Sequence, residues 1–142
     1  MLGEKLGEAN GTLAGVRVLS VEEGSPRLEI SMRGSGTVLG VAFTDMITYS
    51  QVVRPGGIYY GEGETVWLTE DGEISTWKGF GVGKPTGPGF SSSLAVAGSV
   101  QTASAKLARL NGVATVVEYD TDATGNYHWT LWEWKGPAGM GP

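Results

Sequence analysis

Two glutamates, Glu62 and Glu64, stand two residues apart in a segment with the pattern of a β-strand. Because side chains alternate along a strand, both carboxylates would lie on one face, where two carboxyl groups with different pKa values can act as acid and base. The glutamate face would be the less apolar of the two, so the alternation favours an exposed position for both. The pair is therefore a candidate for acid–base catalysis, with a solvated strand face as the alternative.

Glu118 and His128 are the other candidate acid–base residues. His128 is the single histidine of the chain, and a histidine exchanges protons near neutral pH. One histidine in a chain without cysteine cannot build the usual zinc or iron sites, and no catalytic partner is evident in the sequence. A structural or exposed histidine is the alternative, and we expect no metal and no other cofactor.

The glycine-rich stretch 79–89 has a superficial likeness to a phosphate-binding loop. A Walker A motif needs glycine where this chain has Lys78, and serine or threonine where it has Pro85. The net charge is −5, and no cluster of basic residues is present to neutralise a nucleic acid or an anionic membrane. We therefore expect neither nucleic acid nor membrane as a partner. The absence of an apolar leader and of a long apolar run predicts a cytoplasmic protein.

The elements that would position these residues are short strands separated by turns. The sequence predicts strands at about 15–21, 27–33, 38–53, 58–68, 73–82, 91–101, 113–119 and 127–135, with one helical turn at Ser104–Leu110. Strands at this spacing are typical of all-β barrels and sandwiches. We predict one domain over residues 1–142, a closed eight-stranded antiparallel β-barrel with flexible ends at 1–10 and 136–142. A β-sandwich is the alternative.

Asp71 and Gly72 predict the register of the central hairpin. A two-residue turn at these positions would place Glu70 opposite Glu73 and large side chains opposite glycines of the partner strand. On this register one face carries both glutamates with Tyr60, Val66, Leu68 and Trp77. The other face, which we place inside, carries Tyr59, Trp67, Ile74, Phe80 and Val82.

Aromatic residues are the better indication of function. A barrel of eight strands can enclose one small molecule, and an interior aromatic set would line an apolar cavity. The predicted ligand-binding residues are Tyr49, Tyr59, Trp67, Phe80, Tyr119 and Trp129. A filled core is the alternative. The strand at 127–135 is aromatic on both faces, which suggests an outer surface covered in a homo-oligomer.

Several motifs in the second half of the chain resemble a known family. They are Arg54-Pro55-Gly56-Gly57, Gly61-Glu62-Gly63, Thr69–Glu73, the alternating glycines 79, 81 and 83, the segment Gln101–Gly112 (QTASAKLARLNG), Glu118-Tyr119 and Leu131–Lys135. Together they resemble the uncharacterised bacterial and archaeal proteins of the allene oxide cyclase-like barrel group, which shares its fold with the dirigent proteins. The resemblance implies an eight-stranded barrel with a central cavity and, in some members, cyclase activity. It assigns no functional residue here.

Three functions follow from these expectations. The first is a barrel that binds a small apolar molecule in its cavity. The second is a cofactor-independent cyclase or isomerase, in which the cavity holds a reactive conformation and a polar group stabilises developing charge. The third is a structural or oligomerisation module with a filled interior.

Overall fold

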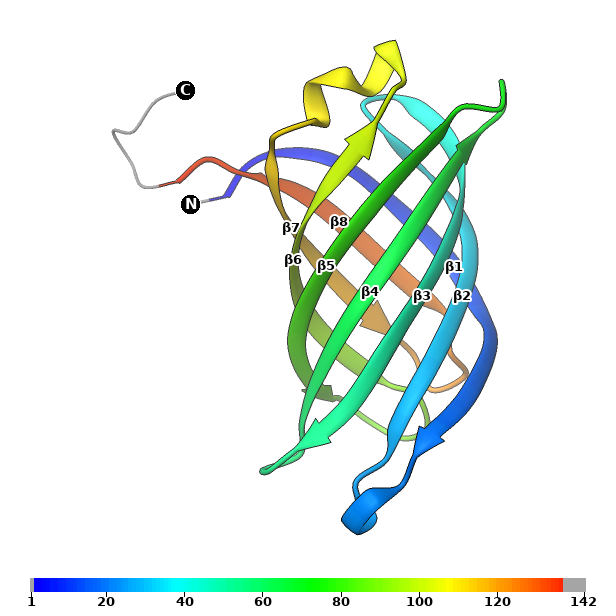
Figure 1. Cartoon of the computed structure of the whole chain (residues 1–142), viewed down its shortest axis with the longest axis vertical. Helices are drawn as coiled ribbons and strands as arrows, with labels where there is room; N and C mark the ends of the chain where they lie inside the picture. The colour runs from blue at the N-terminus through cyan, green and yellow to red at the C-terminus, as the bar shows by residue number, and fades with distance from the viewer. Residues whose placement is uncertain (1, 137–142) are drawn as a thin grey trace.

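The computed structural model describes residues 2–136 and shows a closed antiparallel β-barrel whose strands follow one another in sequence order (Figure 1). Pairing of the first strand with the last closes the barrel, which confirms the predicted fold and leaves no sandwich. The strands are β1 (Leu2–Ser20), β2 (Arg27–Val38), β3 (Val41–Arg54), β4 (Ile58–Thr69), β5 (Ile74–Pro85), β6 (Ser92–Thr102), β7 (Ala114–Thr121) and β8 (Tyr127–Trp134).

The N-terminal residues differ from the expectation. Residues 2–10, predicted to be flexible, form the first half of β1 and pair with β2 on one side and β8 on the other. Without them the barrel would be open between β2 and β8. The predicted flexible C-terminal segment, apart from Gly136, lies outside the described residues. The predicted strand 38–53 begins instead with a tight turn at Leu39 and Gly40, which both have positive φ.

The hairpin between β4 and β5 has a register one residue away from the predicted one. Its loop contains three residues, 70–72, because the Thr69 and Glu73 backbones pair and Gly72 adopts a positive φ of 84°. Trp67 therefore lies opposite Ser75, and Glu62 lies opposite Phe80. A shift of one residue exchanges the two faces of β5, so Trp77 points inward while Ile74, Phe80 and Val82 are exposed.

The short helical segment η2 (Ala105–Leu110) lies at one end of the barrel between β6 and β7, in the region where the sequence predicts a helical turn (Figure 1). Leu107 and Leu110 are buried and pack into the core cluster. The Asn111 side chain holds the segment down, since it accepts a hydrogen bond from the Thr102 N–H and donates one to the Thr102 carbonyl, both at 2.9 Å. The motif Gln101–Gly112 thus has a clear structural role as a cap.

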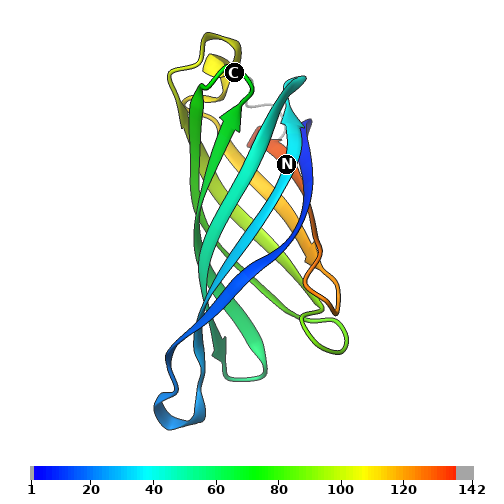
Figure 2. The same ribbon diagram turned by 90° about the vertical axis from the view of Figure 1, so that its right-hand side faces the viewer.

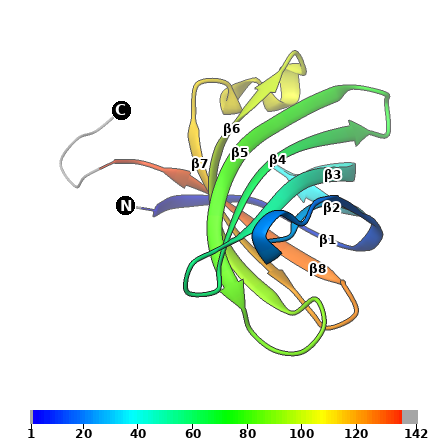
Figure 3. The same ribbon diagram turned by 60° about the horizontal axis from the view of Figure 1, so that its bottom comes forward.

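The opposite end, which we call the mouth, carries the β1–β2 hairpin with the short segment η1 (Glu22–Gly24) (Figures 2 and 3). The inner-face side chains of Leu13, Leu28, Val53 and Tyr59 are only half-buried there. Apolar side chains are therefore fully buried at the η2 end and only half-buried at the mouth. None of the helical segments in residues 2–136 is long and apolar enough to cross a lipid bilayer.

Glycines let two aromatic side chains lie flat on the inner wall. The Trp77 ring covers Gly79 on its own strand and Gly98 on β6, and a Cβ atom on either glycine would overlap the ring. The Tyr127 side chain lies in the same way over Gly11 of β1 and Gly34 of β2. This is the aromatic covering of glycine that the sequence predicts, with different partners.

We expect Gly98→Ala to destabilise the protein by about 1–3 kcal/mol, because the new methyl group must displace the Trp77 ring and the Lys78 carbonyl from close packing. Gly15→Ala is the matched control, since a Cβ atom there meets nothing within 4 Å. Urea unfolding should show a clear loss for the first variant and a change near zero for the second. Equal stability of the two variants would contradict the packing role.

Candidate functional site

An apolar cavity of about 70 Å³ lies inside the barrel and is partly open to solvent. Its lining comes from β3 to β8 and includes no charged side chain. Gly61, Gly63 and Gly81 lie on the inner faces of β4 and β5 where bulky side chains would otherwise fill the barrel. The space is therefore a consequence of glycines at inward positions. It suits a small molecule or the end of a larger one.

Four of the six predicted ligand-binding residues line this cavity: Tyr49, Trp67, Tyr119 and Trp129. Tyr59 is half-buried on the same inner face but lies nearer the mouth. Phe80 was placed wrongly, because its side chain is 57 % exposed on the outer face as a result of the register difference. Trp77, predicted to face outward, is a lining residue.

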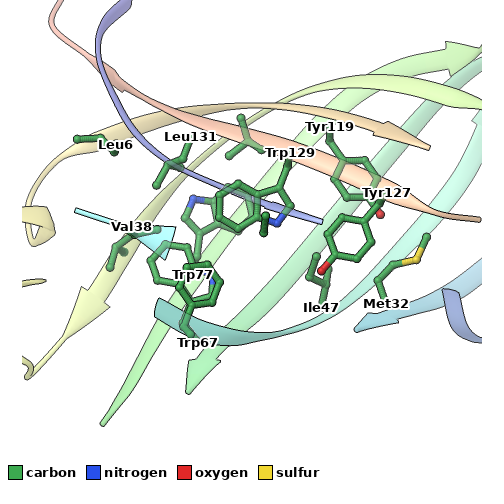
Figure 4. Packing of buried hydrophobic residues seen from close by; sticks show 14 of the residues in the cluster. Leu6, Met32, Val38, Ile47, Trp67, Trp77, Tyr119, Tyr127, Trp129 and Leu131 are labelled. Carbon is green, nitrogen blue, oxygen red and sulfur yellow. The ribbon is translucent and has the colours of Figure 1, made fainter. Parts of the chain in front are cut away.

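Six of the interior aromatic side chains form two groups, one around Trp67 and Trp129 and one around Tyr119 and Tyr127, and these four residues are labelled in Figure 4. Trp67 packs against Phe43 and Trp129, with ring centroids 5.1 Å and 6.0 Å away. Tyr119 meets Tyr49 edge to face at 5.8 Å and stacks on Tyr127, also at 5.8 Å. These contacts fix the ring positions, so the walls of the cavity are preorganised.

Asp45 of β3 is a buried carboxyl group in this aromatic interior, with an exposed fraction of 0 %. Its Oδ2 atom accepts hydrogen bonds from the Tyr127 hydroxyl at 2.6 Å and from the Trp129 indole N–H at 2.9 Å. Its Oδ1 atom is buried without a hydrogen-bond partner. Trp129 lines the cavity as well, so one side chain links the carboxyl group to the apolar space.

Burial raises the pKa of Asp45, while the hydrogen bonds from Tyr127 and Trp129 act in the opposite direction. Burial also raises the pKa of the Tyr119 hydroxyl, and the neighbouring Tyr49 adds to this effect. The pKa of Tyr127 is raised by burial and by its hydrogen bond to Asp45. The interior thus favours neutral forms and keeps the tyrosines protonated at neutral pH.

Two further buried polar atoms, Trp67 Nε1 and Tyr119 Oη, make no hydrogen bond of ideal geometry, but each faces a polar neighbour. The Trp67 indole N–H faces Asp45 and helps to lower the pKa of that carboxyl group. The Tyr119 hydroxyl faces the Tyr49 hydroxyl, which helps to raise the pKa of Tyr119. Both contacts therefore lie within the aromatic wall of the cavity.

The four predicted acid–base residues lie outside the barrel. Glu62, Glu64, Glu118 and His128 are all exposed. Glu62 accepts a hydrogen bond from Tyr60 at 2.7 Å, and Glu118 accepts one from Trp132 at 2.7 Å. His128 Nε2 is 3.7 Å from Glu8. None of them lines the interior cavity, so the exposed alternative holds for both glutamates and for the histidine.

Glu62, Glu64 and Phe80 instead line an open outer groove of about 630 Å³ across β2–β6. Lys78 lies 3.8 Å from Glu64, and both side chains are largely exposed. Exposed ion pairs of this kind contribute little to stability. Within residues 2–136, no three acidic or histidine side chains are grouped to hold a metal ion.

Asp45 is the residue that the sequence analysis missed. The alternation of β3 contains the signal, because Phe43, Ile47 and Tyr49 share one face and Asp45 occupies the same face between them. A single charged residue on an otherwise apolar strand face is expected to be buried. Burial of a charge lowers the stability of the fold unless the charge is well paired, so a buried charge is a candidate for function.

Comparisons with known proteins give the fold. The chain matches a conserved protein of unknown function from Rhodopseudomonas palustris with a TM-score of 0.77 and 13 % identity, covering 94 % of this chain and 97 % of that one. A β-barrel-like protein from Acinetobacter baumannii matches with a TM-score of 0.72 and 18 % identity, covering 94 % of each chain.

An enzyme from Penicillium herquei also has this fold, with a TM-score of 0.64 and 16 % identity, covering 90 % of this chain and 92 % of that one. No protein-family model matches the sequence, and no curated protein matches it. At these identities the likeness shows the barrel fold and leaves the activity open.

Asp45→Asn should stabilise the protein at neutral pH. The raised pKa of Asp45 in the folded state means that its ionised form destabilises the fold. The wild type therefore loses stability as the pH rises from the unfolded-state pKa of an aspartate, about 3.9, through the folded-state pKa of Asp45. The variant lacks this loss, and its advantage should grow by about 1.4 kcal/mol per pH unit between those two pKa values. Denaturant unfolding at several pH values measures the difference.

Asp120→Asn is the matched control, because Asp120 is exposed on β7. Its stability relative to wild type should change little across the same pH range. If the Asp45 variant were less stable than wild type at neutral pH, the carboxyl group would be a net stabilising element and its functional interpretation would fail.

Proposed function

We propose that this barrel binds a small, uncharged and largely apolar molecule in its interior. The observation that carries the proposal is the cavity between Tyr49, Trp67, Tyr119 and Trp129, which has no charged lining residue. Glycine at several inward positions provides the space, and aromatic contacts hold the walls in place. Burial of the ligand's apolar surface would supply most of the binding free energy.

The ends of the barrel support entry from one side. Leu107 and Leu110 close the η2 end, whereas the mouth is edged by half-buried apolar side chains such as Leu28 and Val53. A ligand longer than the cavity would keep its outer part against these residues. The resemblance to the allene oxide cyclase-like barrels, which implies a central cavity, is consistent with this arrangement.

A cofactor-independent isomerase or cyclase is the second candidate, and Asp45 favours it. Asp45 is a buried carboxyl group with a raised pKa, and it is joined to the cavity through its hydrogen bond with Trp129, so it could exchange a proton with a ligand when that indole moves aside. The enzyme from Penicillium herquei demonstrates that a barrel of this fold can support catalysis. A filled structural module is the third candidate, and it predicts that no ligand enters.

Val96→Phe tests the cavity as the binding site. Val96 lines the cavity, so the larger ring should fill it and abolish binding of a probe such as cyclopentanone. Ala97→Phe is the matched control, because the next residue along β6 faces outward and the change leaves the cavity intact. Binding is measured by the ligand-induced rise in unfolding free energy, about 2.7 kcal/mol at a ligand concentration one hundred times the Kd.

Loss of binding in Val96→Phe with retention in Ala97→Phe supports the interior site. Loss only in Ala97→Phe would move the site to the outer groove. No binding to wild type by cyclopentanone or by small molecules extracted from the native host would favour the filled module and contradict the proposal.

A deuterium-exchange experiment tests the enzyme candidate. If Asp45 acts as a base, it removes a proton from the carbon beside the carbonyl of cyclopentanone, and a deuteron from D₂O replaces it when the enol collapses. The protein should then accelerate deuterium incorporation, measured by mass spectrometry, and Asp45→Asn should lose the effect. Glu62→Gln, on the outer face, should retain it. An acceleration that survives Asp45→Asn would exclude this role.

A further inference from the structure

The outer face of three neighbouring strands, β5, β6 and β7, carries a continuous apolar area (Figure 1). Phe80 and Val82 of β5 are 57 % and 47 % exposed. Phe80 lies beside Ala97 of β6, which lies beside Val116 of β7, and Val82 lies beside Ala95. Single exposed apolar side chains are common, but an area that crosses three strands is typical of a contact surface. We call this surface the β5–β7 face, and its outward residues are Lys78, Phe80, Val82, Lys84, Ser93, Ala95, Ala97, Ser99, Ala114, Val116, Glu118 and Asp120.

The side chains of the β5–β7 face are small in the middle and larger at the edges. From Ser93 to Ser99, β6 presents only serine and alanine outward, whereas Phe80 of β5 and Val116 of β7 stand on either side. The wall of a closed barrel is convex across its strands, so small side chains on the central strand flatten the face. Two such faces can therefore approach each other closely along β6.

The charges of the β5–β7 face are separated by strand. Lys78 and Lys84 lie on β5. Glu118 and Asp120 lie on β7, and all four side chains are exposed. The Trp132 indole N–H donates a hydrogen bond to Glu118 at 2.7 Å, which draws that carboxylate toward β8 and away from β6. One apolar face thus has a basic edge on β5 and an acidic edge on β7.

We propose that the β5–β7 face binds the same face of a second copy of this chain, about a two-fold axis that runs along β6. This symmetry brings β5 of each copy opposite β7 of the other, so the basic edge meets the acidic edge twice. The rows of the sheet place Lys84 of one copy opposite Asp120 of the other. In the next rows Phe80 lies opposite Val116, and Ala97 of each copy lies beside the axis.

The charges favour this orientation over the alternative. A two-fold axis across the strands would place β5 on β5, with Lys78 of one copy opposite Lys84 of the other. Like charges opposite each other at an interface are strongly unfavourable. The face is therefore complementary to itself in one orientation, which is the property that a symmetric dimer requires and a reason to favour a second copy over an unrelated partner. The cavity lies inside the barrel, so the dimer does not depend on ligand binding.

Analytical ultracentrifugation over a concentration series tests the dimer. A face about three strands wide is small for a specific interface, so we expect a dissociation constant on the order of 10 µM. Ala97→Glu places two carboxylates beside the axis and should weaken the dimer more than tenfold. Circular dichroism should show that the variant is folded, because Ala97 is exposed. If this variant does not fold, the charge variants described next decide alone.

Charge reversal tests the orientation. Lys84→Glu and Asp120→Lys should each weaken the dimer about tenfold, because each places like charges opposite each other twice. The two single variants should associate when mixed, and the double variant should return to within about threefold of the wild-type dissociation constant. Lys106→Glu is the matched control, since it makes the same change of charge as Lys84→Glu on exposed η2, outside this face. It should leave the dimer unchanged.

A wild type that stays monomeric up to millimolar concentration would overturn the proposal. A trimer or larger ring would do the same, because its contacts are not related by a two-fold axis. A dimer that persists in Ala97→Glu and in both charge variants uses another surface, which also contradicts the proposal. If the double variant fails to recover association, the β5-on-β7 orientation is wrong. None of these results affects the proposed ligand binding inside the barrel.

Discussion

The interior is organised by the hydrogen bonds that Asp45 accepts from Tyr127 and Trp129. A carboxyl group with no exposed surface requires donors on facing strands, and here β8 supplies both of them to β3 across the barrel. To reach Asp45, the Tyr127 side chain must lie flat on the wall, which requires Gly11 and Gly34 beneath it. A single buried polar contact therefore couples four strands, β1, β2, β3 and β8, and it fixes the ring of Trp129 that borders the cavity.

The glycines on the other side of the barrel have a complementary effect. Gly61, Gly63 and Gly81 bring no side chain into the interior, so the aromatic residues of β3, β4, β7 and β8 face an unfilled space. A core under selection for stability alone would fill that space, because each missing methyl or methylene group forfeits burial and dispersion energy. The buried acid and the inward glycines both lower the stability of the fold, and they lie in the same part of the barrel. Functional sites are commonly found where a protein departs from its most stable packing in this way.

The sequence predicted the barrel well, because alternation of apolar and polar residues and turn residues mark part of all eight strands. It missed the first half of β1, where alternation is weak in residues 2–10, and the turn at Leu39 and Gly40. It predicted the β4–β5 faces less well. Asp71 and Gly72 are compatible with loops of two or three residues, and the single-residue difference exchanged Trp77 and Phe80 between inside and outside. Residues far from this loop, such as Tyr49, Tyr119 and Trp129, were placed correctly on the inner face. Glu62, Glu64 and Glu118 were poor candidates for the cavity because glutamates are common on the exposed face of any strand. An aspartate on an apolar strand face is rare, so Asp45 was the more informative residue.

The two ends of the barrel differ in how completely their apolar side chains are buried. Ion pairs of η2, between Lys106 and Asp71 and between Arg109 and Glu4, are exposed and contribute little. The cap is held by the burial of Leu107 and Leu110 and by the two hydrogen bonds of Asn111, so it opens only if apolar surface is exposed. At the mouth, by contrast, apolar side chains are already half-exposed in the resting state. On the proposed function, exchange of a ligand through the mouth would therefore require less loss of core packing than exchange through the η2 end.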